Sequence, residues 1–309
     1  MHYGELTQNM ETVHTIGWQG ITVTVPAHWH LAHARGTVRN GYFRVDDEEH
    51  PRIEVRWSHP KRNLDLSVRA RRYLTLLRRR ARRDGKKIQF SESPRPFTSS
   101  SVPKNKEVLC FSWSTDVHAW GTIWKCRDCG RVVAAQVLFH GRDKNFSLVK
   151  QVLSSLEDHP QSEEVLWCAH GLSFSLPDQF KVKEWVAKLD SSRAEFQAKR
   201  RNRLIIACRD AAQSGSDPAT LVRFAKRTLK RRGKRLFETF RTERVLSHDG
   251  IAFAEAEPIR RLRRRRGPVR KRPYGVAFYC PERGKQFAIM ANDRHREFVG
   301  KALTHFACH

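Results

Sequence analysis

Gly20-Ile21-Thr22-Val23-Thr24-Val25-Pro26 is the stretch that decides the fold, because a close counterpart of it occurs later in the chain. That counterpart, offset by 151 residues, is Gly171-Leu172-Ser173-Phe174-Ser175-Leu176-Pro177. Apolar and polar residues alternate in both copies, which predicts a strand with one buried face, and the proline indicates where each strand ends. An internal duplication is therefore the first expectation.

Further blocks of similar sequence follow in the same order. One pair of matching blocks consists of Gly121-Thr122-Ile123-Trp124-Lys125-Cys126 and Gly275-Val276-Ala277-Phe278-Tyr279-Cys280. In addition, the helix expected after Phe146 matches the one expected after Phe298. Between the two copies, residues 157–162 are polar and include a proline, as is common in interdomain linkers. We therefore expect two tandem repeats, residues 1–160 and 161–309, the second carrying a basic loop inserted at 259–273.

Each repeat is expected to be an antiparallel sheet packed by helices. In the first repeat, strands at 41–45 and 52–57 flank the acidic turn Asp46-Asp47-Glu48-Glu49, which is typical of a hairpin. Apolar residues recur at three- and four-residue steps over 64–83, which predicts an amphipathic helix ended by Asp84-Gly85. Two or three more strands are expected, at 108–114, 119–125 and 131–139, before the helix that contains Phe146. This order of elements predicts an α+β fold.

The opening strand also resembles a known group of proteins. Gly-Ile-Thr-Val-Thr-Val-Pro-Ala-His-Trp at 20–29 is similar to the first strand of the PsbP-like superfamily, and the helix from Phe146 to Leu156 resembles its last helix. The resemblance implies a tandem pair of PsbP-like sandwiches. Members of that superfamily serve as binding and assembly factors, so it implies no particular enzyme activity and assigns no site residue. A duplicated saddle like that of the TATA-binding protein is the alternative topology, although its lobes are shorter.

The charge of the chain points to a polyanionic partner. Among 309 residues, 59 are Lys or Arg and 32 are Asp or Glu, which gives a net charge of +27 at pH 7. The hydrophobic share of 39% is sufficient for packed cores, so the chain is expected to fold. A neutral small-molecule substrate does not require such a charge, whereas nucleic acid attracts it.

Several features indicate a cytoplasmic protein. The first residues lack the basic and apolar regions of a secretory signal. Residues 12–34 hold no Lys, Arg, Asp or Glu, but their period-two alternation and Pro26 exclude a membrane helix. The seven cysteines are odd in number and irregularly spaced, which favours reduced thiols over a disulfide framework. We expect a cytoplasmic location and no membrane partner.

Arginine predominates in four basic runs. Its planar guanidinium grips phosphate oxygens in pairs and stacks on bases, so a preference for it over lysine favours nucleic-acid contact over a merely solvated helix face. The basic loop is expected to order on RNA or DNA. The candidate nucleic-acid-binding residues are Arg71, Arg72, Arg78, Arg79, Arg82, Arg83, Lys86, Arg200, Arg201, Arg227, Lys230, Arg231, Arg232, Lys234, Arg260, Arg261, Arg263, Arg264, Arg265, Arg266, Arg270, Lys271 and Arg272.

These residues predict a non-catalytic protein that contacts phosphates, and therefore binds mostly without sequence specificity. A structured RNA or a ribonucleoprotein surface is slightly preferred to DNA as the partner, since no DNA-reading motif occurs. Such a partner would place the protein in a larger complex. The rival is an assembly adaptor for an acidic protein. A metal-dependent nuclease is the third alternative, with Asp46, Asp47, Glu48, Glu49 and Glu54 holding Mg²⁺; no catalytic motif supports it and no catalytic residue is assigned.

Cys126-Arg127-Asp128-Cys129-Gly130 has the form of half a zinc knuckle. A complete site needs two more ligands, and Cys168 with His170 or Cys308 with His309 are the candidates in the sequence. The equivalent turn in the second repeat has arginine where the second thiol would be, at Arg283. A reduced structural hairpin without a cofactor is the favoured interpretation, with zinc at Cys126 and Cys129 as the alternative.

Four aromatic residues occur on two expected neighbouring strands. Phe111, Trp113, Trp120 and Trp124 could stack on exposed bases, as aromatic residues do in sheet-based RNA binders. Alternating aromatic residues in strands more often fill the interface between a sheet and its helices. Core packing is therefore expected.

Overall fold

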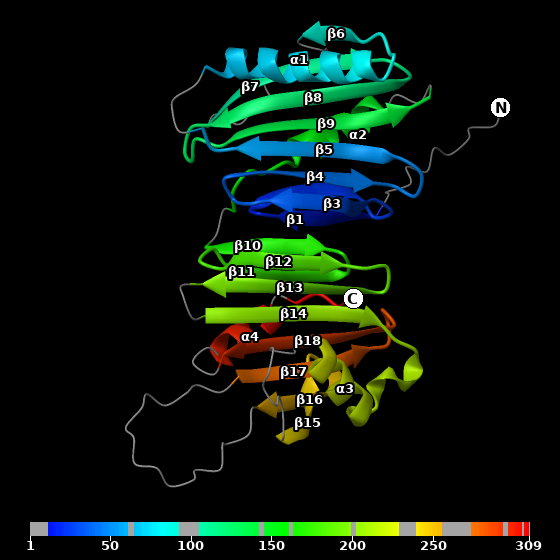
Figure 1. Cartoon of the computed structure of the whole chain (residues 1–309), viewed down its shortest axis with the longest axis vertical. Coiled ribbons are helices and arrows are strands. Elements are labelled where there is room, and N and C mark those ends of the chain that lie inside the picture. The colour runs from blue at the N-terminus through cyan, green and yellow to red at the C-terminus, as the bar shows by residue number, and fades with distance from the viewer. Residues whose placement is uncertain are drawn as a thin grey trace, which may run out of the picture. The chain divides into compact units, whose positions relative to one another are not determined.

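The computed structural model describes residues 12–60, 65–92, 105–141, 145–160, 163–198, 202–228, 239–254, 273–292, 296–304 and 306–308. The chain divides into two compact units, Met1–Gln161 and Ser162–His309, here called the first and second unit. Figure 1 shows the strands and helices of both. Each unit is considered by itself below.

The first unit has nine strands and two helices in its described residues. In chain order they are β1 (Val13–Trp18), β2 (Ile21–Pro26), β3 (His30–Gly36), β4 (Asn40–Asp46), β5 (Pro51–Ser58), α1 (Leu66–Arg83), β6 (Gln89–Glu92), β7 (Lys106–Ser114), β8 (Val117–Cys126), β9 (Val132–His140) and α2 (Phe146–Ser154). Strands β1 and β2 form an antiparallel hairpin, and the other seven form a sheet in the order β3-β4-β5-β9-β8-β7-β6.

The alternating stretch at 20–26 forms strand β2. A two-residue turn before it joins β2 to β1 as a hairpin. Gln19 and Gly20 both have positive φ angles, 56° and 79°, as the tight turns that suit the twist of a hairpin require. Ile21, Val23 and Val25 are buried. From the sequence, each repeat is expected to open with this strand, but the structure has β1 before it, a strand in which Ile16 and Trp18 are buried.

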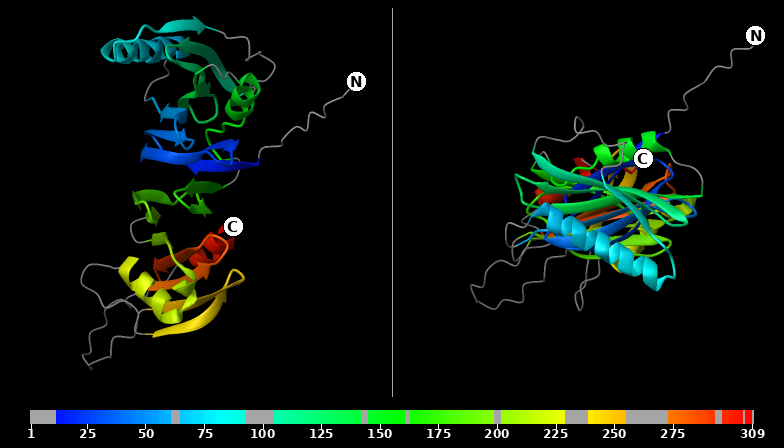
Figure 2. Two further views of the ribbon diagram at one scale, coloured as in Figure 1. Left: turned by 90° about the vertical axis from the view of Figure 1, so that its right-hand side faces the viewer. Right: turned by 90° about the horizontal axis from the view of Figure 1, so that it is seen from above.

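The sheet of the first unit is covered on both faces. Helix α1 contacts β7 and β8, while α2 contacts β2, β8 and β9. In the left view of Figure 2 these two helices lie on opposite sides of the sheet. Strands β8 and β9 run through the centre and are buried along most of their length. This layered arrangement leaves the outer face of α1 exposed to solvent.

The second unit has nine strands, three helices and corresponding layers in its described residues. They are β10 (Glu164–Ala169), β11 (Leu172–Pro177), β12 (Lys181–Ala187), β13 (Ser191–Ala198), β14 (Asn202–Asp210), the 3₁₀ turn η2 (Gln213–Ser216), α3 (Pro218–Thr228), β15 (Thr239–Val245), β16 (His248–Ala254), β17 (Pro273–Cys280), β18 (Lys285–Asn292) and α4 (Arg296–Thr304). Strands β10 and β11 pair as a hairpin, and the seven-stranded sheet has the order β12-β13-β14-β18-β17-β16-β15.

Helices α3 and α4 pack on opposite faces of the second sheet, as the left view of Figure 2 shows. Leu221, Phe224 and Ala225 of α3 lie in a core with Ile205 of β14 and Ile251 of β16. Helix α4 instead contacts β11, β17 and β18. Both units are thus antiparallel sheets with helices packed on them, which confirms the predicted α+β class.

Over the described ranges, no helix has the length and apolar character needed to cross a bilayer.

Candidate nucleic-acid interface

Helix α1 is held on the sheet by one apolar stripe. Leu66, Ala70 and Leu74 are buried and pack against Phe111 of β7 and Ile123 of β8. The Asp65 carboxylate caps the helix start by accepting a hydrogen bond from the Ser67 amide at 2.7 Å. The Asp84 amide closes the other end by donating to the Arg80 carbonyl. The helix predicted at 64–83 is therefore confirmed.

The outer surface of α1 carries the arginines that the sequence singles out. The exposed cations form what we call the α1 basic face: Arg71, Arg72, Arg78, Arg79, Arg82, Arg83 and Lys86. Lys86 bonds Asp116 at 2.6 Å, and Arg83 lies 3.7 Å from Asp84. Arg71 interacts with the Asp65 carboxylate, whereas over the described part of the chain Arg72, Arg79 and Arg82 have no carboxylate partner. Their charges are therefore not neutralised within this part of the protein.

Such a concentration of charge works against the helix that carries it. Residues 66–83 contain eight arginines and no Asp or Glu. Arg79, for example, has Arg82 and Arg83 at the i+3 and i+4 positions, where like charges cost about 0.2–0.5 kcal/mol per pair. The helix dipole offsets part of this cost, because Arg80, Arg82 and Arg83 lie in the last turn. A bound polyanion would remove the remaining repulsion.

Two apolar side chains interrupt the α1 basic face. Val68 is 42% exposed and Leu76 is 62% exposed. With Arg71, Arg72, Thr75 and Arg79 they line a shallow depression on the helix surface. The face can therefore make apolar contacts as well as ionic ones.

A chain of hydrogen bonds crosses the sheet surface beneath the C-terminal half of α1. Trp113 Nε1 donates to Gln136 Oε1, Gln136 Nε2 to Glu54 Oε2, and the Tyr42 hydroxyl to Glu54 Oε1, each at 3.0 Å. Burial, reinforced by the Glu54 carboxylate, raises the pKa of Tyr42. Trp113, Gln136 and Glu54 line a pocket together with Leu77 and Arg80 of α1.

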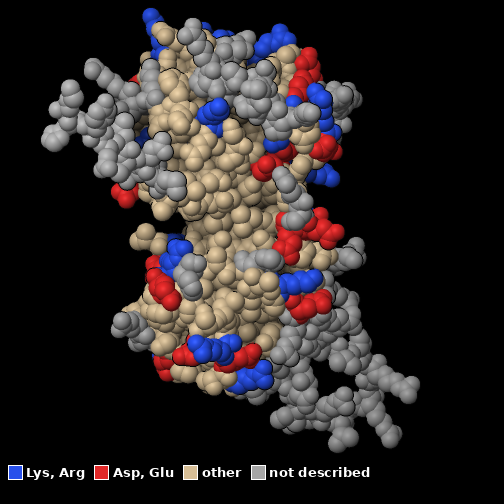
Figure 3. All heavy atoms as spheres, turned by 180° about the vertical axis from the view of Figure 1, so that it is seen from behind, with Lys and Arg blue, Asp and Glu red and all other residues tan. Residues whose placement is uncertain are grey.

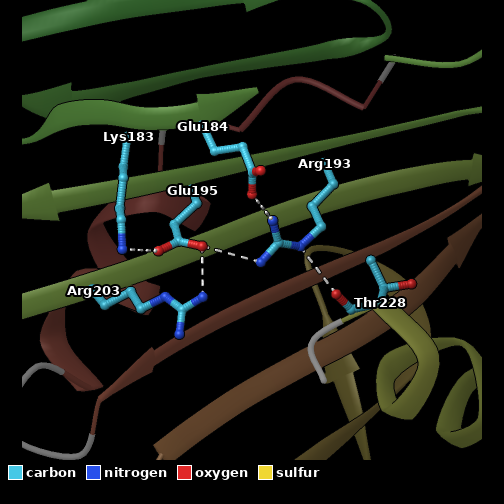
Figure 4. A network of polar contacts seen from close by, with 6 residues as sticks. All are labelled: Lys183, Glu184, Arg193, Glu195, Arg203 and Thr228. Carbon is cyan, nitrogen blue, oxygen red and sulfur yellow. Dashed lines mark hydrogen bonds and ion pairs between the residues drawn. The ribbon is translucent and has the colours of Figure 1, made fainter. Parts of the chain in front are cut away.

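In the second unit, the corresponding described cations lie on α3 and the neighbouring strands. Arg223, Lys226 and Arg227 are exposed on α3. Close to the end of this helix, Arg193 Nε donates to the Thr228 carbonyl at 3.1 Å (Figure 4). Strand β13 thereby fixes the C-terminal end of α3.

Glu195 lies at the centre of the polar network in Figure 4. Its side chain is only 4% exposed, and it accepts hydrogen bonds from Arg203 at 2.5 Å and Arg193 at 3.2 Å, with Lys183 at 3.4 Å. Burial raises the pKa of Glu195, but the hydrogen bonds and charge of Arg203, and then Arg193 and Lys183, outweigh it and hold the pKa below its usual value. Glu184 also pairs with Arg193, at 3.0 Å, so three cations face two carboxylates and the network keeps one excess positive charge.

On the side of the molecule opposite to the view of Figure 1, positive and negative side chains are intermixed. In each unit, the view from behind in Figure 3 shows described Lys and Arg side chains beside Asp and Glu, with uncharged residues between them. Neighbouring opposite charges cancel at a distance, so a mixed surface attracts a polyanion less than a uniform one does. The α1 basic face has no such acidic neighbours on its own helix.

Only part of the predicted interface can be placed. Arg227 belongs to α3 and is exposed. The remaining candidates lie outside the described residues: Arg200, Arg201, Lys230, Arg231, Arg232, Lys234, Arg260, Arg261, Arg263, Arg264, Arg265, Arg266, Arg270, Lys271 and Arg272. Lys183, Arg193 and Arg203 were not among the candidates. Lys183 and Arg193 lie outside the basic runs, and Arg203, the last residue of the run at 199–203, was not singled out. Their clustering depends on strand pairing, which no local pattern indicates.

The aromatic residues of β7 and β8 belong to the core. Phe111, Trp120 and Trp124 are buried, and Trp120 packs edge-on against Phe146 of α2 with ring centroids 4.8 Å apart. Trp113 is partly buried against the core beneath α1. The expected core packing is confirmed.

The Asp46 and Asp47 carboxylates at the hairpin tip bond to other residues of the same hairpin. Asp47 accepts hydrogen bonds from the amides of Glu49 and His50 and pairs with Arg52, while Asp46 pairs with Arg44 at 2.7 Å. Within the described ranges, the groups of side chains arranged to hold a metal ion do not include these carboxylates. They are accounted for by the hairpin that they stabilise.

Cys126 ends β8 and Cys129 lies in the turn that follows. The side chains next to these thiols are Asp158 and His159. Of the predicted completing ligands, Cys308 instead lies with His248 and Cys280 in the second unit, and the His170 carbonyl accepts from Cys208 at 3.8 Å. His309 lies outside the described residues. Asp158 and His159 had been assigned only to the linker, some 30 residues from the thiols in sequence.

No protein-family model matches the chain, and no curated protein matches its sequence. Among solved structures, the chain is similar to the immunity protein TplEi of T6SS from Pseudomonas aeruginosa, complexed with "L" peptide. That similarity covers 96% of this chain and 97% of the other, at 10% sequence identity and a TM-score of 0.32. A similarity at this level carries no inference about fold or function.

Proposed function

We propose that this protein is a non-catalytic binder of nucleic acid that contacts the phosphate backbone, with structured RNA or a ribonucleoprotein surface as the preferred partner. The observation that carries the proposal is the α1 basic face. Several of its guanidinium groups are exposed and have no carboxylate partner in the described residues. Guanidinium groups in this state form bidentate hydrogen bonds with phosphate oxygens.

The energetics of α1 support the same proposal. An isolated helix with this arginine content is destabilised by its own charges, and an anionic ligand that binds the folded protein would offset that repulsion. The excess of arginine over lysine favours phosphate and base stacking over general solubility. Contacts of this type carry little sequence information, so the expected binding is largely non-specific.

We further propose that the two units are copies of one ancestral motif, of the PsbP-like sandwich type. Three observations support this: the hairpin that opens each unit, the same order of strands in the two seven-stranded sheets, and a helix on each face of both sheets. Cover on both faces favours a sandwich over a saddle whose sheet is open on one side.

The test of function compares two double variants with the same loss of charge. Arg72→Gln with Arg79→Gln removes two cations from the α1 basic face, and Gln preserves helix propensity. Arg35→Gln with Arg39→Gln is the matched control, because both arginines are exposed in or near the β3–β4 hairpin of the same unit. Binding to a labelled RNA hairpin and to a DNA duplex of random sequence is measured by fluorescence anisotropy.

We expect the α1 variant to bind about tenfold more weakly at about 100 mM salt, one decade being about 1.4 kcal/mol. The control is expected to bind like the wild type, with a small loss from its changed net charge. Equal effects of the two variants would assign binding to net charge alone and would refute a specific role of α1.

The adaptor for an acidic protein remains the second candidate, and the exposed Leu76 favours it. A packed protein interface depends on a few apolar side chains, whereas phosphate contacts do not. Leu76→Gln should leave RNA binding unchanged if the phosphate proposal is correct. A protein partner recovered from cell extract by the wild type and lost in Leu76→Gln, with no RNA binding by either, would establish the adaptor instead.

A further inference from the structure

Four potential metal ligands of the first unit lie together at the edge of the sheet. The ligand atoms of Cys126, Cys129, Asp158 and His159, here called the thiol cluster, all lie within 4.8 Å of one another. Cys126 Sγ is 3.3 Å from His159 Nε2, and Cys129 Sγ is 3.5 Å from Asp158 Oδ2. Tetrahedral zinc with thiolate, imidazole and carboxylate ligands separates its ligand atoms by about 3.3–3.8 Å. These two distances fall within that range.

The turn that carries the thiols is closed by backbone hydrogen bonds. The Gly130 amide donates to the Cys126 carbonyl at 3.0 Å, and the Cys126 amide donates to the Arg131 carbonyl at 2.9 Å. Gly130 has a φ of 71°, and a Cβ at this position would meet nothing within 4 Å. The glycine is therefore required by backbone conformation, which brings the two thiols to the same side of the turn.

The other two ligands are held in place by contacts of their own. Residue 157 pairs with β2, because the Thr22 and Glu157 amides donate to each other's carbonyls at 3.0 Å. The buried Arg131 guanidinium donates to the Asp158 carbonyl and to His59. This arrangement orients Asp158 and His159 before any ion binds, which lowers the cost of forming a site.

The surroundings of the Asp158 carboxylate suit a metal ligand. It is fully buried, and its Oδ1 receives no hydrogen bond within the described residues. Lys106 Nζ lies 3.5 Å from Oδ1, and the Lys106 side chain is 8% exposed. Zinc with two thiolates, one carboxylate and one neutral imidazole has a net formal charge of minus one, which Lys106 and Arg131 are placed to compensate. Buried carboxylates of this kind are paired or coordinate metals.

We propose that the thiol cluster is a structural zinc site, with Cys126, Cys129, Asp158 and His159 as its four ligands. Two thiolates and an imidazole in tetrahedral arrangement select zinc over the hard cations that prefer oxygen ligands. All four positions are filled by protein side chains, so the ion has a structural role rather than an open catalytic position. On binding, both thiols lose their protons to solvent and the zinc–sulfur bonds form.

The second unit has a related group of three ligands. His248, Cys280 and Cys308 are all buried, with His248 Nε2 3.2 Å from Cys308 Sγ. The Cys280 thiol donates to Glu282 at 3.2 Å and to the Cys308 carbonyl at 3.6 Å. Arg283 occupies the position of the second thiol in this turn. The proposed zinc site lies in the first unit alone. The test therefore compares the metal content of variants of that site with that of the wild type, rather than relying on total metal content.

The test uses cobalt(II) as a spectroscopic probe on the full chain, after removal of metal with a chelator under reducing conditions. The wild type should show the thiolate charge-transfer and tetrahedral d–d bands, and zinc should abolish them. Cys129→Ala and His159→Ala should each bind one cobalt ion fewer than the wild type. Both side chains are at least partly exposed, so these variants are expected to fold. Cys110→Ala is the control, since this half-buried thiol lies outside the cluster.

A second measurement needs no variant. In the zinc-loaded wild type, the exposed Cys129 should resist alkylation until chelator is added, as determined by mass spectrometry of the labelled peptide. The proposal is overturned if the reduced wild type binds no cobalt, if Cys129→Ala binds as much as the wild type, or if Cys129 alkylates at the same rate with and without zinc.

Discussion

Asp47 is a charged residue whose contacts stabilise the hairpin of β4 and β5 in the first unit. Its carboxylate accepts two backbone amides and pairs with Arg52, and its side chain is only 11% exposed. Burial raises the pKa of Asp47, but the His50 and Glu49 amides and then Arg52 outweigh it and hold the pKa at about 2. Within this hairpin, the acidic run is consistent with a structural role.

Asp47→Asn tests this role through the dependence of stability on pH. Because the pKa is about 2 in the folded protein and about 3.9 in an unfolded chain, ionised Asp47 contributes about 2.6 kcal/mol above pH 4. That contribution is lost as the pH falls from about 4 through 2. We expect the variant to be less stable than the wild type by up to about 2.6 kcal/mol at pH 7, with the difference shrinking toward pH 2 in urea unfolding. A difference independent of pH would contradict this explanation.

Arg131 makes contacts that could not be predicted from the sequence. It is 4% exposed, yet its guanidinium donates to the carbonyls of Asp158, Gln19 and Val38. These residues are distant in sequence and belong to three different connections. A lone arginine next to a Cys-x-x-Cys motif has the same local pattern as an exposed one, so its burial could not be predicted. The same reason explains why Asp158 and His159 were not expected beside the thiols.

At the scale of elements, Gly121 and Gly275 allow an aromatic ring to lie over the centre of each sheet. A Cβ on Gly121 would lie 2.3 Å from Phe111 Cζ, and one on Gly275 would lie 2.4 Å from Phe253 Cε2. In each case the ring belongs to the residue paired with the glycine across the ladder. These glycines begin the two blocks that match in the sequence, so their similarity has a packing reason.

Gly121→Ala and Gly275→Ala should each destabilise the protein by about 1–3 kcal/mol, because the added methyl group overpacks a core that has no space for it. Gly300→Ala in α4 is the control. A Cβ there meets nothing within 4 Å, and alanine favours the helix by about 1 kcal/mol. Urea unfolding of the three variants measures the difference. If the first two variants are as stable as the wild type, the glycines are not required for ring packing.

The elements that could be predicted are those whose pattern is local. Helix α1 has a regular apolar stripe and the stop signal Asp84-Gly85, and the β4–β5 hairpin has an acidic turn between alternating strands. Strands β1, β3 and β6 were missed or left undefined. β6 has four residues and β3 has the polar sequence His-Leu-Ala-His-Ala-Arg-Gly, and both are edge strands, so neither needs a strong apolar pattern.

At the scale of the whole molecule, the net charge of +27 is the property from which a polyanionic partner was predicted. Charge of one sign opposes the compact state, and a polyanion that binds only the folded protein offsets this effect. The α1 basic face locates part of that charge on one surface. The proposed zinc site is independent of this argument, because its ligands contribute nothing to the basic face.

The salt dependence of nucleic-acid binding by the wild type tests the central claim most directly. Dissociation constants for an RNA hairpin are measured between about 50 and 200 mM salt. If the α1 basic face engages at least four phosphates, the logarithm of the association constant should fall linearly with the logarithm of salt concentration, with a slope of about −3 or steeper. Absence of binding at about 100 mM salt, or a slope near zero, would contradict the account and favour a protein partner.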